Sequence, residues 1–526
     1  MNKTITKLGM ILAFVLSFLS ASAYDFEVDG LYYTVTDLPN LECEVVSGDT
    51  KYEGEVVIPS TVTFNSQTFT VVGIGNSAFK SSSLTRVMIP DSVTSIGSYA
   101  FNYCRSLTSV TIPDSVTSIG ESAFEDCSSL TSVTIPDSVT SIGESAFYRC
   151  SSLLSITIPD SVTSIGEAAF YDCRSLTSVT IGNSVKSIGG SVFAGCSSLT
   201  SVMIPDSVTS IGDDVFIGCI SMTSVTIGNS VMSIGETAFS DCRSLTSITI
   251  PDSVTSIGSY AFFGCDLLTS VTILDSVKSI GEAAFSDCRS LTSVKLSKNL
   301  ERINYGTFEN CPELESIEIP GSVKEIVQYK VFFYRSNYTF TNLKKLTLKY
   351  SGEYLSSAYY SSSSLSIYSS EWDSSITDKL EEVFFDRQMK YSMPLPNVKI
   401  LSFGEHLKEV QVEDIQNCEN LDTIVCYGTE PPTLPECSNQ QYMDVVVKVP
   451  QNALEKYQQA ENWKNFWNIQ GFDPAQSSVD EIPATTVEKV ETGRYNLNGQ
   501  RVGEDYKGIV IVRYSDGSTR KLIYHK

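Results

Sequence analysis

The hydrophobic residues in the middle of the chain follow a pattern that repeats every 23 residues. In one unit, Val110 and Ile112 stand two positions apart, and Ser109 and Thr111 alternate with them. Alternation with a period of two predicts a short strand whose apolar side chains face a core and whose hydroxyl side chains face outward. A second apolar pair follows in the same unit and is also expected to face inward.

The remaining apolar residues of the unit, Phe124, Cys127 and Leu130, are spaced three apart. This spacing predicts a short helical turn, of the 3₁₀ type. Each unit thus carries about seven apolar groups that it cannot bury alone, so neighbouring units must stack about 4.7–4.9 Å apart in a parallel sheet. A period of 20–50 residues is typical of a solenoid. The predicted fold is a leucine-rich-repeat solenoid, because L-x-x-V-x-I at 107–112 has the strand pattern of such repeats.

Ten cysteines mark the register of the units. Parallel stacking holds their Cβ atoms farther apart than a disulfide prefers, and a linear row cannot surround a zinc ion tetrahedrally. We therefore interpret the row as a structural ladder of small buried hydrophobic groups, whereas a disulfide is more plausible for Cys426 and Cys437 in the closing segment. The ladder comprises Cys104, Cys127, Cys150, Cys173, Cys196, Cys219, Cys242, Cys265, Cys288 and Cys311.

The chain begins with the pattern of an export signal. A short positive region precedes an apolar stretch at residues 8–19, and Ala21-Ser22-Ala23 has the small-x-small form of a cleavage site. Twelve apolar residues span only about 18 Å as a helix, which is too short for a bilayer core. We expect the mature chain to begin at Tyr24 and the protein to be exported.

The repeat pattern and its interruptions predict seven segments. A solenoid needs both ends covered, and a continuous helix over residues 453–467, with Trp463 and Trp467 on one face, is expected in the closing cap. The segments are a signal peptide (1–23), an N-terminal β cap (24–57), regular repeats (58–326), irregular repeats (327–426) with a Tyr/Ser-rich insertion (350–375), a C-terminal cap (427–473), a linker (474–490) and a small β tail (491–526).

The unit IPDSVTSIGESAFEDCSSLTSVT at residues 112–134 closely resembles the BspA-like leucine-rich repeat of bacterial surface proteins, especially those of the Bacteroidetes. The opening YDFEVDGLYY and the closing CYGTEPPTL…VKVPQNALEKYQQAENWKNF are similar to the caps of that family. The tail YNLNGQRV…KGIVIV is similar to Bacteroidetes C-terminal sorting domains, which serve export and surface attachment. The resemblance implies adhesion or host interaction at the cell surface and supplies no catalytic residue.

Composition and charge exclude several classes of function. With 61 acidic against 37 basic residues, the formal charge is −24, which disfavours nucleic acid as a partner. Only two histidines are present, and phosphate-binding loops, H-E-x-x-H and G-x-S-x-G are absent from the sequence. We therefore expect no enzyme activity, no cofactor and no metal. Calcium at the row of aspartates that includes Asp114 and Asp137 is a weaker interpretation, because Asp after Pro is ordinary in turns.

Three surfaces are candidates for binding. The outward strand positions form a flat polar face, which is either a solvated sheet or a platform for a repetitive ligand. The pair of residues before each cysteine varies, which reflects either tolerance or a binding edge. The insertion has the Tyr/Ser composition of antibody paratopes, or is a disordered loop. The candidates are Ser132, Thr134, Ser155, Thr157, Ser178 and Thr180 on the face, and Tyr350, Tyr354, Tyr359, Tyr360, Tyr368 and Trp372 in the insertion.

Two functional hypotheses follow from these observations. The first is a secreted or outer-surface binding protein that adheres to a host extracellular-matrix or cell-surface protein or glycan through its repetitive solenoid surface. The second is a structural stalk or surface-layer component without a specific ligand. The sequence does not name the ligand.

Overall fold

The computed structural model describes residues 24–329, 343–350, 356–360, 366–368, 379–388, 395–411, 415–416, 418–474, 491–496, 503, 508–514 and 519–524. The expected signal peptide and nearly all of the expected linker lie outside these residues. The chain divides into two compact units, Met1–Ser270 and Val271–Lys526, which are described separately.

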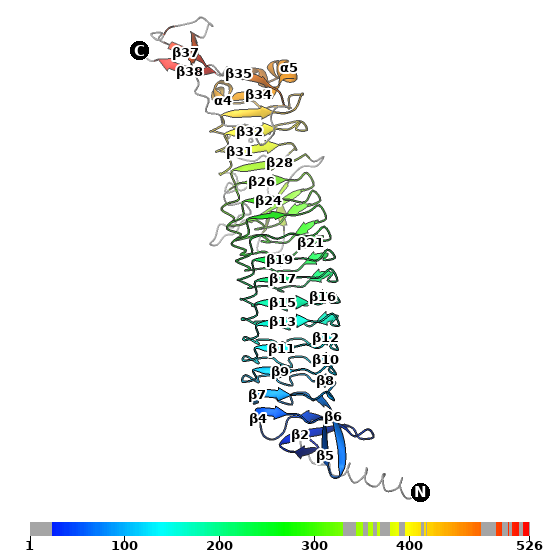
Figure 1. Ribbon diagram of the computed structural model, residues 1–526. Coiled ribbons are helices and arrows are strands. Elements are labelled where there is room, and N and C mark those ends of the chain that lie inside the picture. The colour runs from blue at the N-terminus through cyan, green and yellow to red at the C-terminus, as the bar shows by residue number, and fades with distance from the viewer. Residues whose placement is uncertain are drawn as a thin grey trace. The chain divides into compact units, whose positions relative to one another are not determined.

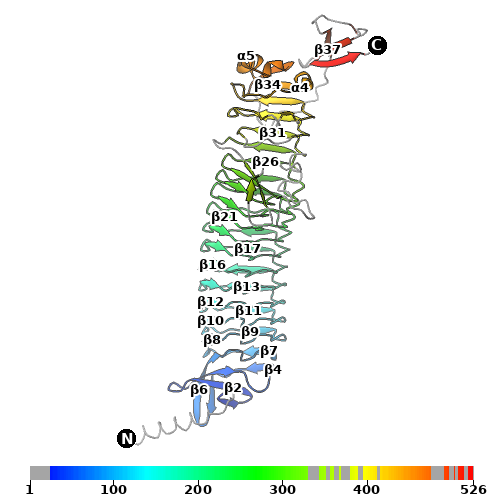
Figure 2. The ribbon, with the colours of Figure 1, turned by 180° about the vertical axis from the view of Figure 1, so that it is seen from behind.

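The first unit is a parallel solenoid in which most coils contribute two short strands (Figures 1 and 2). Equivalent residues pair from coil to coil, for example Val110 with Val133 and Ile119 with Ile142. One column of strands contains β4 (Glu53–Val57), β7 (Ser83–Met88), β9 (Ser109–Thr111), β11 (Ser132–Thr134), β13 (Ser155–Ile158), β15 (Ser178–Ile181), β17 (Ser201–Met203) and β19 (Ser224–Thr226). The other contains β6 (Gln67–Ile74), β8 (Ser95–Ile96), β10 (Ser118–Ile119), β12 (Ser141–Ile142), β14 (Ser164–Ile165), β16 (Ser187–Ile188), β18 (Ser210–Ile211), β20 (Ser233–Ile234) and β21 (Ser256–Ile257).

The N-terminal cap extends the second column with antiparallel strands. It consists of β1 (Phe26–Val28), β2 (Leu31–Asp37) and β3 (Glu42–Val46), and β3 pairs in parallel with β6. A hairpin of β5 (Thr61–Phe64) and β6 lies beside it. The first column begins at β4, which lies inside the segment expected to form the cap and already pairs with β7. Cap and solenoid therefore overlap in sequence.

The expected helical turn in each unit is replaced by consecutive turns. Ser122 and Asp126 both have left-handed backbones, with φ of 50° and 56°, and these conformations interrupt a helix. The turns form a third hydrogen-bonded column, because the N–H groups of Ser122, Phe124 and Asp126 donate to carbonyls of the next coil at 2.8, 2.8 and 2.7 Å. Backbone groups that a helix would satisfy locally are satisfied between coils instead.

The core of the first unit consists of columns of identical side chains. Nine phenylalanine rings from Phe79 to Phe262 stack nearly parallel, with centroid separations from 5.0 Å to 5.6 Å. Beside them each ladder thiol of the first unit donates a hydrogen bond to a phenylalanine carbonyl of an earlier coil, as Cys150 Sγ does to Phe124 O at 3.2 Å. The cysteine thus packs as a hydrophobic group and also satisfies a backbone acceptor.

One glycine in each coil permits this close stacking. A Cβ atom on Gly143 would lie 2.6 Å from the carbonyl carbon of Gly120 in the preceding coil, well inside contact distance. Its N–H donates to Ile119 O at 3.0 Å. The Ile-Gly pair of the repeat therefore marks the point where neighbouring coils approach most closely.

The second unit continues the same construction less regularly. The largest sheet runs β26 (Ser316–Ile319), β28 (Lys345–Leu348), β31 (Glu382–Phe385), β32 (Ile400–Phe403), β33 (Thr423–Cys426), β34 (Val446–Pro450) and β35 (Asn468–Phe472), all parallel. The other strands are β22 (Ser270–Thr272), β23 (Ser279–Ile280), β24 (Ser293–Lys295), β25 (Arg302–Ile303), β27 (Glu325–Tyr329), β29 (Ser356–Tyr360) and β30 (Ser366–Tyr368). The Tyr/Ser-rich insertion contributes β29 and β30, which form a hairpin beside β27.

In the closing cap, residues 453–467 form separate short helical segments rather than the one continuous helix expected. After α4 (Asn439–Asp444) and β34, η1 (Gln451–Ala453) leads into α5 (Leu454–Gln459), and η2 (Trp463–Asn465) follows. The prediction of a continuous helix is wrong because Asn462 has a left-handed backbone with φ of 63°. Trp463 is consequently buried and donates to Pro432 O, whereas Trp467 is 48% exposed.

The tail forms a small antiparallel sheet of β36 (Glu491–Asn496), β37 (Gly508–Tyr514) and β38 (Thr519–Tyr524). Its strands confirm that the C-terminal region is a β structure. Across the described residues, no helix is long and apolar enough to cross a membrane.

All fourteen cysteines are buried free thiols, including Cys426 and Cys437, for which the sequence makes a disulfide more plausible than for the ladder cysteines. Burial raises the pKa of Cys104 and Cys219 to about 12, and raises that of Cys150 well above its usual range. A thiol in an unfolded chain ionises near pH 8.5. The folded protein therefore keeps its thiols protonated under conditions in which the unfolded chain loses those protons.

This difference predicts alkaline destabilisation. Above about pH 9 the free energy of unfolding should fall by about 1.4 kcal/mol per pH unit for each such thiol, because a raised folded-state pKa stabilises only below the unfolded pKa. Urea unfolding between about pH 8 and 11 measures the slope. A Cys150→Ala/Cys173→Ala variant lacks two of these thiols. Its free energy of unfolding should therefore fall less steeply with pH, by the contribution of two thiols. The account would be contradicted if the variant and the parent had equal slopes. It would also be contradicted if thiol counting in denaturant without reductant found the thiols blocked.

Candidate functional site

The strand face of the first unit is exposed, as the alternating pattern predicts. Val133, Ile156 and Val179 are buried, whereas the six candidate residues of the face are all exposed. These are Ser132, Thr134, Ser155, Thr157, Ser178 and Thr180. Parallel pairing places Ser155 beside Ser178 and Thr157 beside Thr180 in register, so the same side chains recur from coil to coil.

The face differs in its hydrogen bonding from the hydroxyl columns that contain Thr131 and Ser161. Thr131 Oγ1 donates to Thr108 O at 3.2 Å, and Ser161 Oγ donates to Val139 O at 2.7 Å, so these columns fasten one coil to the next. By contrast, the hydroxyls of the six face candidates have no protein partner among the described residues. They form a grid of uncommitted donors and acceptors that is available to a ligand or to water.

The residues just before and just after each ladder cysteine form one edge of the solenoid, which we call the turn edge. A backbone constraint limits which residues can occupy it. The residue before every ladder cysteine has a left-handed backbone, with φ between 52° and 72°. Glycine, aspartate and asparagine tolerate this conformation, and they occupy eight of the ten positions. The ten residues are Tyr103, Asp126, Arg149, Asp172, Gly195, Gly218, Asp241, Gly264, Asp287 and Asn310. The residue at this position varies less freely than the sequence suggests, because the left-handed backbone restricts which residues fit.

Tyr103 and Arg149 are the two exceptions. A bulky side chain in the left-handed region costs about 1–2 kcal/mol. Such strain persists where something compensates for it and is concentrated at functional sites. Arg105 lies over the ring of Tyr103, with 5.1 Å from its guanidinium carbon to the ring centroid. Arg149 lies over the ring of Tyr148 at the same distance.

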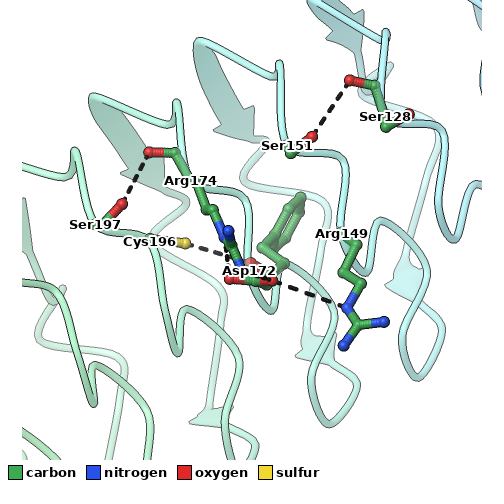
Figure 3. Close-up of polar contacts among 8 residues, drawn as sticks. Ser128, Arg149, Ser151, Asp172, Arg174, Cys196 and Ser197 are labelled. Atoms are coloured by element: carbon green, nitrogen blue, oxygen red, sulfur yellow. Dashed lines mark hydrogen bonds and ion pairs between the residues drawn. The ribbon is translucent and has the colours of Figure 1, made fainter.

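Most arginines of the turn edge pair with an acid in their own coil. In Asp-Cys-Arg triplets the carboxylate stands before the cysteine and the guanidinium after it. Arg174 holds Asp172 through two hydrogen bonds of 2.8 and 2.9 Å, and Arg243 holds Asp241 at 3.0 Å. Arg149 departs from this arrangement because it occupies the acid's position, and its Nε lies 3.8 Å from Asp172 Oδ2 in the next coil (Figure 3).

The cluster around Arg149 also contains an aromatic pair. Tyr148 and Tyr171 stack with their ring centroids 4.8 Å apart and their planes within 9°. Partial burial, the largest cause, raises the pKa of Tyr148, although Arg149 opposes the rise. The side chain of Arg149 is 51% exposed and that of Arg174 is 68% exposed, while Asp172 is largely covered. Basic, acidic and aromatic groups thus meet at one place on the turn edge.

In the second unit, the structure places one insertion candidate in a defined contact. Tyr350 is 51% exposed, and its ring stacks on His406 with centroids 3.8 Å apart. His406 Nδ1 lies 3.1 Å from Asp386 Oδ1. Tyr359 and Tyr360 belong to β29 and Tyr368 to β30, but their side chains, like Tyr354 and Trp372 as a whole, lie outside what the structure describes.

The second unit also has surface groups that the sequence reasoning missed. Glu315 pairs with Lys344, and Glu381 pairs with Lys399 at 2.8 Å, around a hollow of about 670 Å³. Aromatic rings lie on the outward face of the same sheet, where Tyr427 contacts Phe384 and Phe472 at centroid distances of 5.7 Å. The sequence carried a signal for the charged pairs, because acidic and basic residues alternate from one irregular repeat to the next.

Within the described residues, no group of three or more His, Cys, Asp or Glu side chains is arranged to hold a metal ion. The aspartate row serves the turns instead. Asp160 Oδ1 accepts a hydrogen bond of 2.7 Å from the N–H of Asn183, and Asp206 does the same for Asn229. These contacts connect neighbouring coils.

Comparison with known families agrees with the repeat architecture. The profile of the BspA type leucine rich repeat region (6 copies) matches overlapping stretches at residues 72–200, 121–245, 209–339 and 256–391, which together cover more than half of the chain. The chain belongs to the BspA-type leucine-rich repeat family. A search of curated proteins found no match.

The chain is also similar to solved leucine-rich repeat structures. A leucine-rich repeat protein from Bacteroides ovatus is 28% identical, with a TM-score of 0.55, and the match covers 77% of this chain and 95% of that one. A leucine rich cell surface protein from Faecalibacterium prausnitzii is 25% identical, with a TM-score of 0.43, over 76% of this chain and 94% of that one. The solenoid fold expected from the 23-residue period is confirmed.

The left-handed backbone before each ladder cysteine of these BspA-type coils leads to a testable prediction. Tyr103→Asn should raise the free energy of unfolding by about 0.5–1 kcal/mol, because asparagine adopts this conformation at lower cost. Tyr103→Val should lower it, since a β-branched side chain fits the left-handed region worst. Urea unfolding of both variants against the parent tests this. If Tyr103→Asn proved less stable than the parent, the contact between Arg105 and Tyr103 would outweigh the backbone strain at this position.

Proposed function

We propose that this BspA-type protein is displayed at the cell surface and binds an extended, repetitive macromolecule of a host or a neighbouring cell through the strand face of its solenoid. The observation that carries the proposal is the grid of exposed, uncommitted hydroxyls. Neighbouring hydroxyl columns donate to backbone carbonyls, whereas Ser132, Thr134 and their equivalents do not. A grid that offers the same groups at every coil suits a polymer with its own repeat, such as a glycan or a fibrous protein.

The uniformity of the repeats determines how such binding must work. Coils of nearly the same sequence cannot form different subsites, so each offers a copy of one weak site. Weak copies gain overall affinity when a polymer engages several of them at once. The resemblance to bacterial surface proteins and the leader pattern at residues 1–23 support an extracellular location. We propose no catalytic role.

Deleting whole coils tests whether affinity depends on the number of coils. Removing 23, 46 or 69 residues, beginning at Ile112, keeps the register and both caps. Because each coil contacts only its neighbours, the fold should survive. We expect affinity for a polymer, found by screening matrix proteins and glycans, to fall stepwise by severalfold per deletion. Constant affinity across the series would place recognition elsewhere, and no binding across the panel would favour the structural-stalk hypothesis.

A pair of matched variants locates the binding face. Thr134→Lys, Thr157→Lys and Thr180→Lys together place bulky charges on the proposed face. Serine-to-lysine changes at Ser141, Ser164 and Ser187 add the same charge to the other strand column. We expect the first set to abolish binding of the polymer and the second to leave it unchanged. Equal effects would show that charge, rather than the strand face, controls binding.

The β tail is proposed to direct or retain the protein at the surface. The solenoid closes at its own cap before the linker, so the tail should add nothing to its stability. We expect deletion of residues 491–526 to leave the melting temperature unchanged and to alter the cellular location, measured by fractionation with the full chain as control. An unchanged location would remove the support for a sorting role.

A further inference from the structure

Arg149 has a guanidinium that the protein uses only in part. Asp172, its nearest acid, already accepts two hydrogen bonds from Arg174, and the 3.8 Å separation from Arg149 Nε exceeds hydrogen-bond length. The two terminal amino groups of Arg149 have no partner among the described residues, and Figure 3 shows them pointing away from Asp172. A strained residue therefore presents an unoccupied pair of donors to solvent.

The surroundings hold this donor pair in place. The ring of Tyr148 lies against the guanidinium, Tyr171 supports that ring from the next coil, and Asp172 attracts Nε. A guanidinium has its donors in a planar fork that matches the two oxygens of a carboxylate. Because the fork is already oriented, little side-chain entropy would be lost on binding an oxyanion.

The charge of the whole chain narrows the class of ligand. A protein with a formal charge of −24 repels polyanions at long range, so heavily charged polymers are poor ligands. A single carboxylate within a mostly uncharged molecule meets the local donor pair at much lower electrostatic cost. The neighbouring tyrosine rings suit the apolar ring faces of a sugar.

We propose that Arg149, with Tyr148 and Tyr171, forms a subsite for the carboxylate of an acidic sugar residue within a largely neutral glycan. Arg149 is the anchor, and the tyrosine pair orients it and contacts the sugar ring. The subsite lies on the turn edge, so it can exist whether or not the strand face binds a polymer. It would add selectivity for acidic glycans to a surface that is otherwise uniform.

The test uses the full chain and calorimetric titration with three probes. The first is an acidic trisaccharide of two galactose residues and one galacturonate residue, the second is neutral galactotriose, and the third is the end-blocked tripeptide Gly-Glu-Gly, which carries one carboxylate. We expect the acidic trisaccharide to bind at least about tenfold more tightly than the other two, because charge-assisted hydrogen bonds add affinity and the ring contacts require a sugar. Arg149→Asn should weaken binding of the acidic trisaccharide about tenfold or more, and Arg149→Lys nearly as much, since lysine keeps the charge but lacks the fork.

Tyr103→Asn is the matched control, because it introduces the same residue at the equivalent left-handed position two coils away. It should leave all three affinities unchanged, while thermal unfolding should show that both asparagine variants are at least as stable as the parent. A loss of binding of the acidic trisaccharide in Arg149→Asn alone supports the subsite. The proposal is overturned if the parent does not bind the acidic trisaccharide, if galactotriose binds equally well, or if both asparagine variants lose binding together. Equal or tighter binding of the Gly-Glu-Gly tripeptide would overturn it in favour of an acidic peptide.

Discussion

The whole structure depends on coils stacking at the spacing of hydrogen-bonded strands. At that spacing a side chain has no room at the closest approach in the first unit, so a glycine such as Gly143 stands there. The same spacing brings phenylalanine rings to 5.0–5.6 Å in the first unit, a distance at which stacking is favourable. It also sets each ladder thiol of the first unit against a carbonyl of an earlier coil. The glycine position, the stacked phenylalanine core and the environment of the cysteines all follow from this one constraint.

The same constraint separates structural from available surface. Hydroxyls that reach a carbonyl of the preceding coil, such as that of Thr131, belong to the scaffold. Those that point outward from the strands, such as that of Thr134, have no such partner. A sequence rich in serine and threonine thus contains two populations of hydroxyl that differ only in direction. The division explains how a monotonous repeat can be both stable and free to bind.

The turn edge shows how a solenoid can carry individual features without losing its fold. Its backbone requires a left-handed residue before each cysteine, and most coils meet the requirement with Gly, Asp or Asn. Asp-Cys-Arg triplets then neutralise the acid locally. Where a coil departs from the rule, as at Arg149, the side chain gains an environment that the other coils of the first unit do not provide. One substitution in a uniform array is therefore enough to create a distinct site.

The sequence by itself determined the solenoid, its 23-residue register, the inward residues of both strands and the polar strand face, because each rests on local periodicity that stacking can only reinforce. Tertiary structure decided what periodicity cannot encode. The spacing of Phe124, Cys127 and Leu130 suggested a helix, yet bonds to the next coil favoured left-handed turns. Asn462 ended a helix that composition favoured. The contact of Arg149 with Tyr148 and Asp172, and the pairing of β29 with β27, join residues whose proximity depends on how coils stack.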